Sequence, residues 1–173
     1  YDPRKPVARA FNLAPRYCTP NLIQQPMYQL QRYQPAAFAN HQQVAEAAIG
    51  QIYPRAKITA MQPNKPLTQM AQAGLRQVAQ IIQALQAGQM DVTVYNCLAT
   101  ADVGQAKVQV IFILAIRTLV LNMGVMGQGV DLEVGLRGWG APADEFVNAS
   151  PVLDRIQGSY GVTPAFIQRV VQG

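Results

Sequence analysis

The residues in this sequence that are best suited to chemistry are amide and cationic side chains at helical spacing. Gln69, Gln72, Arg76, Gln80 and Gln83 recur three or four residues apart, so a helix would bring all five to one side. An amide can donate a hydrogen bond to an anionic backbone without repelling it, and arginine adds a bidentate contact. Because the stretch contains no carboxylate, the pattern predicts contact with a phosphate backbone. The alternative is a face that meets water or a neighbouring subunit.

Cationic residues are concentrated in the first half of the chain. Residues 1–90 carry nine Lys and Arg against two acids, a net charge of +7, whereas residues 91–173 carry five against seven, a net charge of −2, which together give the formal +5. This asymmetry indicates a polyanionic partner, and the alternative is a basic tail that keeps the protein soluble. The predicted nucleic-acid-binding residues are Arg4, Lys5, Arg9, Arg16, Arg32, Arg55, Lys57, Lys65, Gln69, Gln72, Arg76, Gln80 and Gln83.

Motifs of known catalytic sites are missing from the sequence. His41 is the single histidine and stands at a predicted helix start, where a surface or capping role accounts for it. Gly138, Gly140 and Ala143 fit the dinucleotide-binding pattern G-x-G-x-x-A, but no second strand follows, so we expect a tight turn there. No nucleophile elbow or Walker A sequence occurs. We therefore expect no enzyme, no cofactor, no metal and no small-molecule substrate.

The composition predicts one domain with a surface that is short of charge. The chain has 173 residues, of which 50% are hydrophobic and only 13% are charged. Free-standing soluble proteins usually carry more charge, so we expect burial against copies or partners. Cys18 and Cys97 lie far apart and match no metal-binding spacing. They are expected as free core thiols, or as a disulfide if the source is oxidising or a hyperthermophile.

The element that must position the amide side chains is a predicted helix from Asn64 to Gly88. Asn64 can cap this helix, Pro66 suits its first turn and Gly88 can stop it. A second helix is predicted upstream, where Asn40 and Gln43 form a capping pair and a proline at position 54 ends the pattern. The long helix has one apolar stripe, made of Leu67, Met70, Gly74, Leu75, Val78, Ile81, Ile82 and Leu85.

Residues 1–39 are predicted to form an extended arm. Six prolines in this segment forbid a long helix, and aromatic residues are interleaved with cations. We expect the arm to make few contacts with its own body and to lie on another subunit or on nucleic acid. Residues 40–173 are expected to form a single helical domain.

The second half of the chain gives weaker signals. Residues 90–98 could be strand or helix, and 106–126 is apolar nearly all round, so it could be a buried element of either type, although its length favours a helix. Its longest apolar run, 108–121, is too short and too interrupted for a membrane span. Residues 130–137 alternate between apolar and other side chains, which predicts an extended segment, with Asp131 and Glu133 on its half-exposed side. The sequence GWGAP then predicts a turn before a short helix, and residues 163–173 predict a final helix.

Three parts of the chain together resemble the major coat proteins of rod-shaped and filamentous archaeal DNA viruses. They are the basic aromatic arm YDPRKPVARAFNLAPRY, the acid-free helix PLTQMAQAGLRQVAQIIQALQAG, and the end SYGVTPAFIQRVVQG, in which Tyr160, Gly161 and Pro164 carry the likeness. The resemblance implies coat subunits that form helical filaments and wrap the genome as an A-form duplex. The arm and the basic helices would then line the DNA, and apolar elements would pack copies together.

These observations lead to one expectation and two alternatives. The fold class is expected to be mainly α, with a helical-bundle body, the arm over 1–39 and a short β segment near 130–137. The expected function is a structural virion protein that polymerises into a helical nucleocapsid around double-stranded DNA. Its partners would be the DNA backbone, copies of itself or a related coat protein, with an enveloping membrane as a further option. The alternatives are a β-barrel capsid subunit of an icosahedral virus and a cellular protein that binds nucleic acid without sequence preference.

Overall fold

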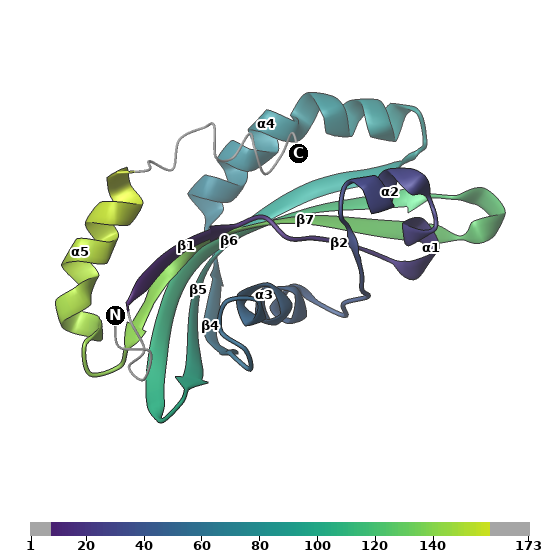
Figure 1. The fold of residues 1–173 in the computed structure, drawn as a ribbon. Helices are drawn as coiled ribbons and strands as arrows, with labels where there is room; N and C mark the ends of the chain where they lie inside the picture. The colour runs from purple at the N-terminus through teal and green to yellow at the C-terminus, as the bar shows by residue number, and fades with distance from the viewer. Residues whose placement is uncertain (1–7, 160–173) are drawn as a thin grey trace.

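The computed structural model describes residues 8–159 of the chain, and this part is organised around one seven-stranded sheet (Figure 1). The strand order is β3-β2-β7-β6-β5-β4, and β1 pairs with β7 on the same side as β2. β2 and β3 run parallel, whereas the other neighbours are antiparallel. The strands are β1 (Arg9–Leu13), β2 (Arg16–Cys18), β3 (Gln34–Pro35), β4 (Lys57–Pro63), β5 (Gly88–Val103), β6 (Ala106–Asn122) and β7 (Gln128–Pro142).

Helices cover both faces of this sheet. α3 lies on the side around which the sheet bends, here called the α3 face (Figure 1). The other helices lie on the opposite side, here called the α4 face. Within the described residues, no helix has both the length and the hydropathy needed to cross a membrane. The helices are α1 (Pro20–Ile23), α2 (Pro26–Leu30), α3 (His41–Gly50), α4 (Lys65–Ala84) and α5 (Phe146–Ser159), and a 3-10 turn at Gly124–Met126 joins β6 to β7.

The starts of α3 and α4 follow the capping signals of the sequence. The Asn40 side chain accepts a hydrogen bond from the backbone N–H of Gln43 at 3.0 Å. The Asn64 side chain accepts one from the N–H of Leu67 at 3.1 Å. Both predicted helices are therefore confirmed, although α4 ends before the glycine that was expected to stop it.

The main core lies between α3 and the sheet. Val44, Ala45, Ala48 and Ile49 are each at most 1% exposed, as their spacing on α3 predicts. They pack in one cluster with the even-numbered side chains of β6 from position 108 to position 116. Because side chains alternate along a strand, the odd-numbered positions of β6 point to the α4 face.

The helix predicted for residues 106–126 is wrong, because this segment is β6 and the 3-10 turn that follows it. β6 is apolar nearly all round because helices pack against both faces of the sheet, as in other sheets that are covered on two sides. β6 has 17 residues, which is longer than most strands, and for this reason the length of the apolar segment favoured a helix in the sequence. The extended segment at 130–137 is confirmed and lies within β7.

The fold class predicted from the sequence, mainly α with a helical-bundle body, is also wrong. The described part of the body is a sheet with helices on both faces, and not a bundle. The turn predicted at GWGAP is wrong because Gly138 and Gly140 lie inside β7. A Cβ atom at Gly138 would collide with the backbone of β6, and one at Gly140 would collide with the Tyr53 ring. The final helix predicted for residues 163–173 lies outside the described residues.

The predicted arm is built into the sheet over its described part. β1 and β2 both pair with β7, and the carbonyl of Pro15 between them accepts a hydrogen bond from the N–H of Val134 at 3.0 Å. The prolines do prevent a long helix, as expected. However, the expectation of few contacts with the protein's own body is wrong for residues 9–35, since these strands satisfy the backbone groups on the outer side of β7.

Leu114 and Ile111, both on β6, should respond very differently to truncation. Leu114 is fully buried against α3, so Leu114→Ala should lower the free energy of unfolding by about 2–5 kcal/mol. Ile111 points to the α4 face and is 39% exposed, so Ile111→Ala should cost less than about 1 kcal/mol. Equilibrium unfolding in urea measures both values. Equal losses for the two variants would contradict the register of β6.

Candidate interaction surfaces on α4

α4 is held on the sheet by the first half of its length. Ala71 and Leu75 are the buried residues of this helix as the structure describes it over 65–84. They pack in one cluster with Val92, Val94 and Ala115 of β5 and β6. The second half of α4 has no such buried anchor, so its sides are free to contact other molecules.

One side of α4 exposes large apolar side chains, and we call it the apolar flank. It consists of Met70, Gly74, Val78, Ile81 and Leu85, which recur three or four residues apart. The four large side chains are 49%, 47%, 53% and 73% exposed in that order. The single stripe seen in the sequence is therefore divided between a part that faces the sheet and a part that faces outward. A contiguous exposed apolar surface of this kind is typical of a protein–protein contact.

The opposite side of α4 carries the predicted amide and arginine residues, and we call it the polar flank. Its members are all exposed: Gln69, Gln72, Arg76, Gln80 and Gln83. The last four of them help to line a hollow of about 290 Å³ between α4 and β5.

The sheet also brings a carboxylate to this flank. Gln72 donates a hydrogen bond from Nε2 to the Asp91 carboxylate at 3.2 Å, and Asp91 lines the same hollow. The helix itself contains no acid, but the site that it forms with β5 does. A phosphate backbone at this flank would therefore approach one negative charge as well as Arg76.

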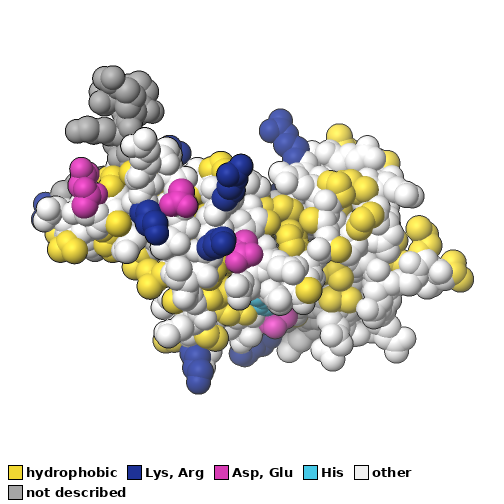
Figure 2. All heavy atoms as spheres, turned by 90° about the horizontal axis from the view of Figure 1, so that it is seen from below, with side chains coloured by type: hydrophobic (Ala, Val, Ile, Leu, Met, Phe, Trp, Pro, Cys, Tyr) yellow, Lys and Arg dark blue, Asp and Glu magenta, His cyan; other side chains and the backbone are white. Residues whose placement is uncertain are grey.

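The other predicted nucleic-acid-binding residues are divided between the two faces. The Arg9 guanidinium lies 5.6 Å from the centre of the Tyr53 ring, in the direction of α3, whereas Arg16 forms an ion pair on the α4 face. Viewed from the side of α3, Lys and Arg side chains are interspersed with Asp and Glu (Figure 2). Arg4 and Lys5 lie outside the described residues. The remaining predicted cations are exposed and stand at element ends or in connections: Arg32, Arg55, Lys57 and Lys65.

Further large apolar side chains are exposed toward one end of the sheet, and we call this group the turn-end patch. It consists of Met27 and Leu30 of α2 with Val125 and Met126 of the β6–β7 turn. The end of α4 adjoins this region, because the backbone N–H of Asn122, at the end of β6, donates a hydrogen bond to the carbonyl of Ala87, two residues after the cap of α4, at 2.9 Å. The turn-end patch and the apolar flank therefore lie on neighbouring parts of the molecule (Figure 1).

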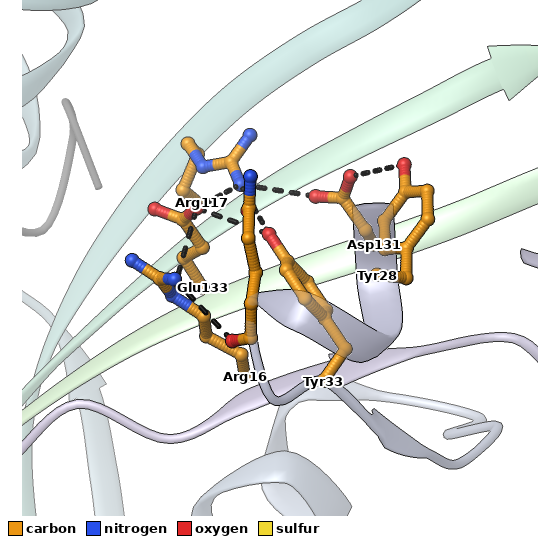
Figure 3. A network of polar contacts seen from close by, with 7 residues as sticks. Arg16, Tyr28, Tyr33, Arg117, Asp131 and Glu133 are labelled. Carbon is orange, nitrogen blue, oxygen red and sulfur yellow. Dashed lines mark hydrogen bonds and ion pairs between the residues drawn. The ribbon is translucent and has the colours of Figure 1, made fainter. Parts of the chain in front are cut away.

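A buried polar network fixes α2 and the chain after it to the sheet (Figure 3). Arg117 Nη2 lies 3.0 Å from Asp131 Oδ1 and 2.9 Å from Glu133 Oε1. The Tyr28 hydroxyl donates to Asp131 at 2.9 Å, and the Tyr33 hydroxyl donates to Glu133 at 3.0 Å. Burial raises the pKa of Asp131, an effect that the Arg117 guanidinium opposes. Each charge in the network has a partner, which is what its burial requires.

Sequence reasoning missed this network. Asp131 and Glu133 fitted the alternation of a half-exposed strand, but Asp131 is only 3% exposed. The tyrosines that bond to them lie about 100 residues earlier in the chain, so no local pattern connects them. An arginine within the apolar run of β6 was the one available signal, because a buried cation needs an acidic partner.

His41 is half-buried and the two cysteines are buried. His41 Nδ1 lies 2.6 Å from the Tyr95 hydroxyl, and burial lowers the pKa of His41. Cys18 and Cys97 are both free and buried, and burial raises the pKa of the Cys97 thiol to about 12. Within the described part of the chain, no group of three His, Cys, Asp or Glu side chains is placed to hold a metal ion.

Comparisons with known proteins identify no relative of this chain. No family model, no curated protein and no solved structure matches it. They neither support nor contradict the resemblance to coat proteins. The function must therefore be inferred from the surfaces described above.

Arg117 provides a direct test of the buried network. Arg117→Met should lower the free energy of unfolding by about 3–5 kcal/mol, because Asp131 would keep its buried charge without a cation and Glu133 would keep only the 3.9 Å contact with Arg16. Arg76→Met on the exposed polar flank is the matched control and should change it by less than about 0.5 kcal/mol. Urea unfolding at neutral pH measures both. If Arg117→Met lowered the free energy of unfolding as little as Arg76→Met, the result would contradict the buried network.

Proposed function

We propose that this protein is a non-enzymatic structural subunit that associates with other protein chains through the apolar flank of α4. The observation that carries the proposal is the exposure of four large apolar side chains along one side of a helix that is well formed and capped. Isolated exposed apolar residues are common on soluble proteins, but a continuous row of them usually marks an interface.

Two further observations support this proposal. The turn-end patch exposes more large apolar side chains close to the end of α4, which widens the surface available to a partner. Only 13% of the residues are charged, so the remaining surface offers little repulsion between chains. Both features are typical of proteins that function inside an assembly.

The virion role is a narrower form of the same proposal. A coat subunit must pack against its neighbours, and the apolar flank supplies a surface for that contact. The helical body implied by the resemblance is not the fold of this chain, however, so the proposal rests on the surfaces alone. An assembly in a virion and an assembly in a cell would use this surface in the same way.

Association should depend on the apolar flank. The double variant Ile81→Gln with Leu85→Gln should reduce association at least tenfold, because burying an amide without a hydrogen-bonding partner is unfavourable. The matched control is Gln80→Ala with Gln83→Ala, which changes the same turns of α4 on its polar flank. Sedimentation velocity over a range of protein concentrations measures the effect. A wild-type chain that remains monomeric at all concentrations would contradict the proposed function.

Binding of a phosphate backbone is a second candidate function, and the polar flank favours it. Lys65 and Arg76 are exposed on the same helix as the four glutamines, and α4 is about 30 Å long at 1.5 Å per residue. That length is close to one turn of duplex DNA. Asp91 is the feature that opposes such binding, since its carboxylate lies beside Gln72.

A salt titration of duplex binding tests this second candidate. Arg76→Ala should reduce the slope of log affinity against log salt by about 0.9, because one phosphate contact is lost. It should also weaken all base sequences alike. Asp91→Asn should strengthen binding, since it removes the opposing charge. Equal slopes and affinities for wild type and both variants would show that the polar flank does not meet DNA.

A further inference from the structure

We propose that the partner at the apolar flank of α4 is the α4 helix of a second copy, packed antiparallel, with Ile81 of each copy set against Gly74 of the other. This inference rests on the proposed function, because it requires the apolar flank to be an interface. It goes further by naming the partner, the direction of the two helices and the residues that meet.

The spacing of the apolar flank is self-complementary in one antiparallel register. If a two-fold axis passes between Gln77 and Val78, Met70 of one copy lies opposite Leu85 of the other. In the same register Gly74 lies opposite Ile81, and the two Val78 side chains meet near the axis. A two-fold interface needs a surface that matches itself, and all five flank residues find an apolar partner in this register.

Gly74 is otherwise unexplained in the middle of this helix. It does not adopt a positive φ, and a Cβ atom placed on it would have no neighbour within 4 Å, so the fold of the subunit does not require glycine. Glycine is also a poor helix former in an exposed helix interior. A second helix that must approach closely at this point does require it, since the missing side chain leaves room for Ile81 of the partner copy.

The charges of α4 favour an antiparallel neighbour over a parallel one. The helix has no acidic residue in its first turn and no basic residue in its last turn, so its own side chains do not compensate its macrodipole. An antiparallel copy brings the positive end of one helix nearer to the negative end of the other than a parallel copy would, and in the proposed register each N-terminus lies about 8 Å along the axis beyond Leu85 of its neighbour. The apolar flank itself carries no charged side chain, so nothing on it repels a second copy.

The size of the contact sets the expected strength of the dimer. In the proposed register the two helices overlap over 70–85, which is about 24 Å, so at a width of about 10 Å each offers roughly 240 Å² to its partner, well below the 800 Å² per partner of a standard stable interface. The pairing should therefore be reversible and dependent on concentration. It is suited to be one of several weak contacts in an assembly.

Cysteine pairing tests the register in the full chain. A mixture of Gly74→Cys chains and Ile81→Cys chains should form a mixed disulfide at least ten times faster than a mixture of Met70→Cys and Ile81→Cys chains. In the proposed register Met70 faces Leu85, about 6 Å along the helix from Ile81. The native thiols of Cys18 and Cys97 are both buried, with pKa values raised by burial, so they should not compete.

A second variant separates association from folding. Gly74→Leu fills the space that Ile81 of the partner would occupy, so it should weaken association at least tenfold in sedimentation experiments. The same change replaces a poor helix former at an open position, so the midpoint of thermal unfolding should stay the same or rise. Unchanged association in Gly74→Leu would overturn the inference.

The outcomes distinguish the inference from the proposed function. Concentration-dependent association with equal disulfide rates in the two cysteine mixtures would overturn the antiparallel pairing and leave the proposed function standing. A wild-type chain that never associates would overturn both. Preferential pairing of positions 74 and 81, lost association in Gly74→Leu and retained thermal stability would together support the inference.

Discussion

The structure depends on covering both faces of one long antiparallel sheet. β5, β6 and β7 together form the centre of the sheet, and neither face of their apolar strands can be left in water without a large cost. α3 covers one face along the middle of β6, where Leu114 and Ile116 are fully buried. The other face is longer than any single helix on it, so α1, α2, α4 and α5 divide it among them. The positions of the polar network and of the apolar flank follow from this division.

Coverage from two sides determines which polar groups can stay in the sheet. Arg117 points to the α4 face between α4 and α2, and it is tolerated there because Asp131 and Glu133 of the neighbouring strand neutralise it. The hydroxyls of Tyr28 and Tyr33 donate hydrogen bonds to these two carboxylates and so attach α2 and the chain after it to β7. α4 is held by Ala71 and Leu75, so the apolar side chains on its flank lie to the side of these contacts and stay exposed.

Local signals in the sequence predicted the helices better than the sheet. The caps at Asn40 and Asn64 act over three residues, so they could be recognised without knowing the rest of the fold. The pairing of β1 and β2 with β7 joins residues more than 100 positions apart, and no periodicity reveals it. The polar flank of α4 was predicted from spacing alone. The exposure of its apolar flank could not be predicted, because it depends on which side of the helix faces the sheet.

The two proposed activities do not compete for the same surface. At about 100° per residue, Arg76 lies about 140° around the helix axis from Ile81, so the polar and apolar flanks face nearly opposite directions. A second copy on the apolar flank would leave Arg76 and the glutamines exposed, and in a two-fold pair the two polar flanks would point away from each other. Such a pair could contact two separate partners, one on each side. Self-association through α4 is therefore compatible with backbone binding, and neither proposal depends on the other.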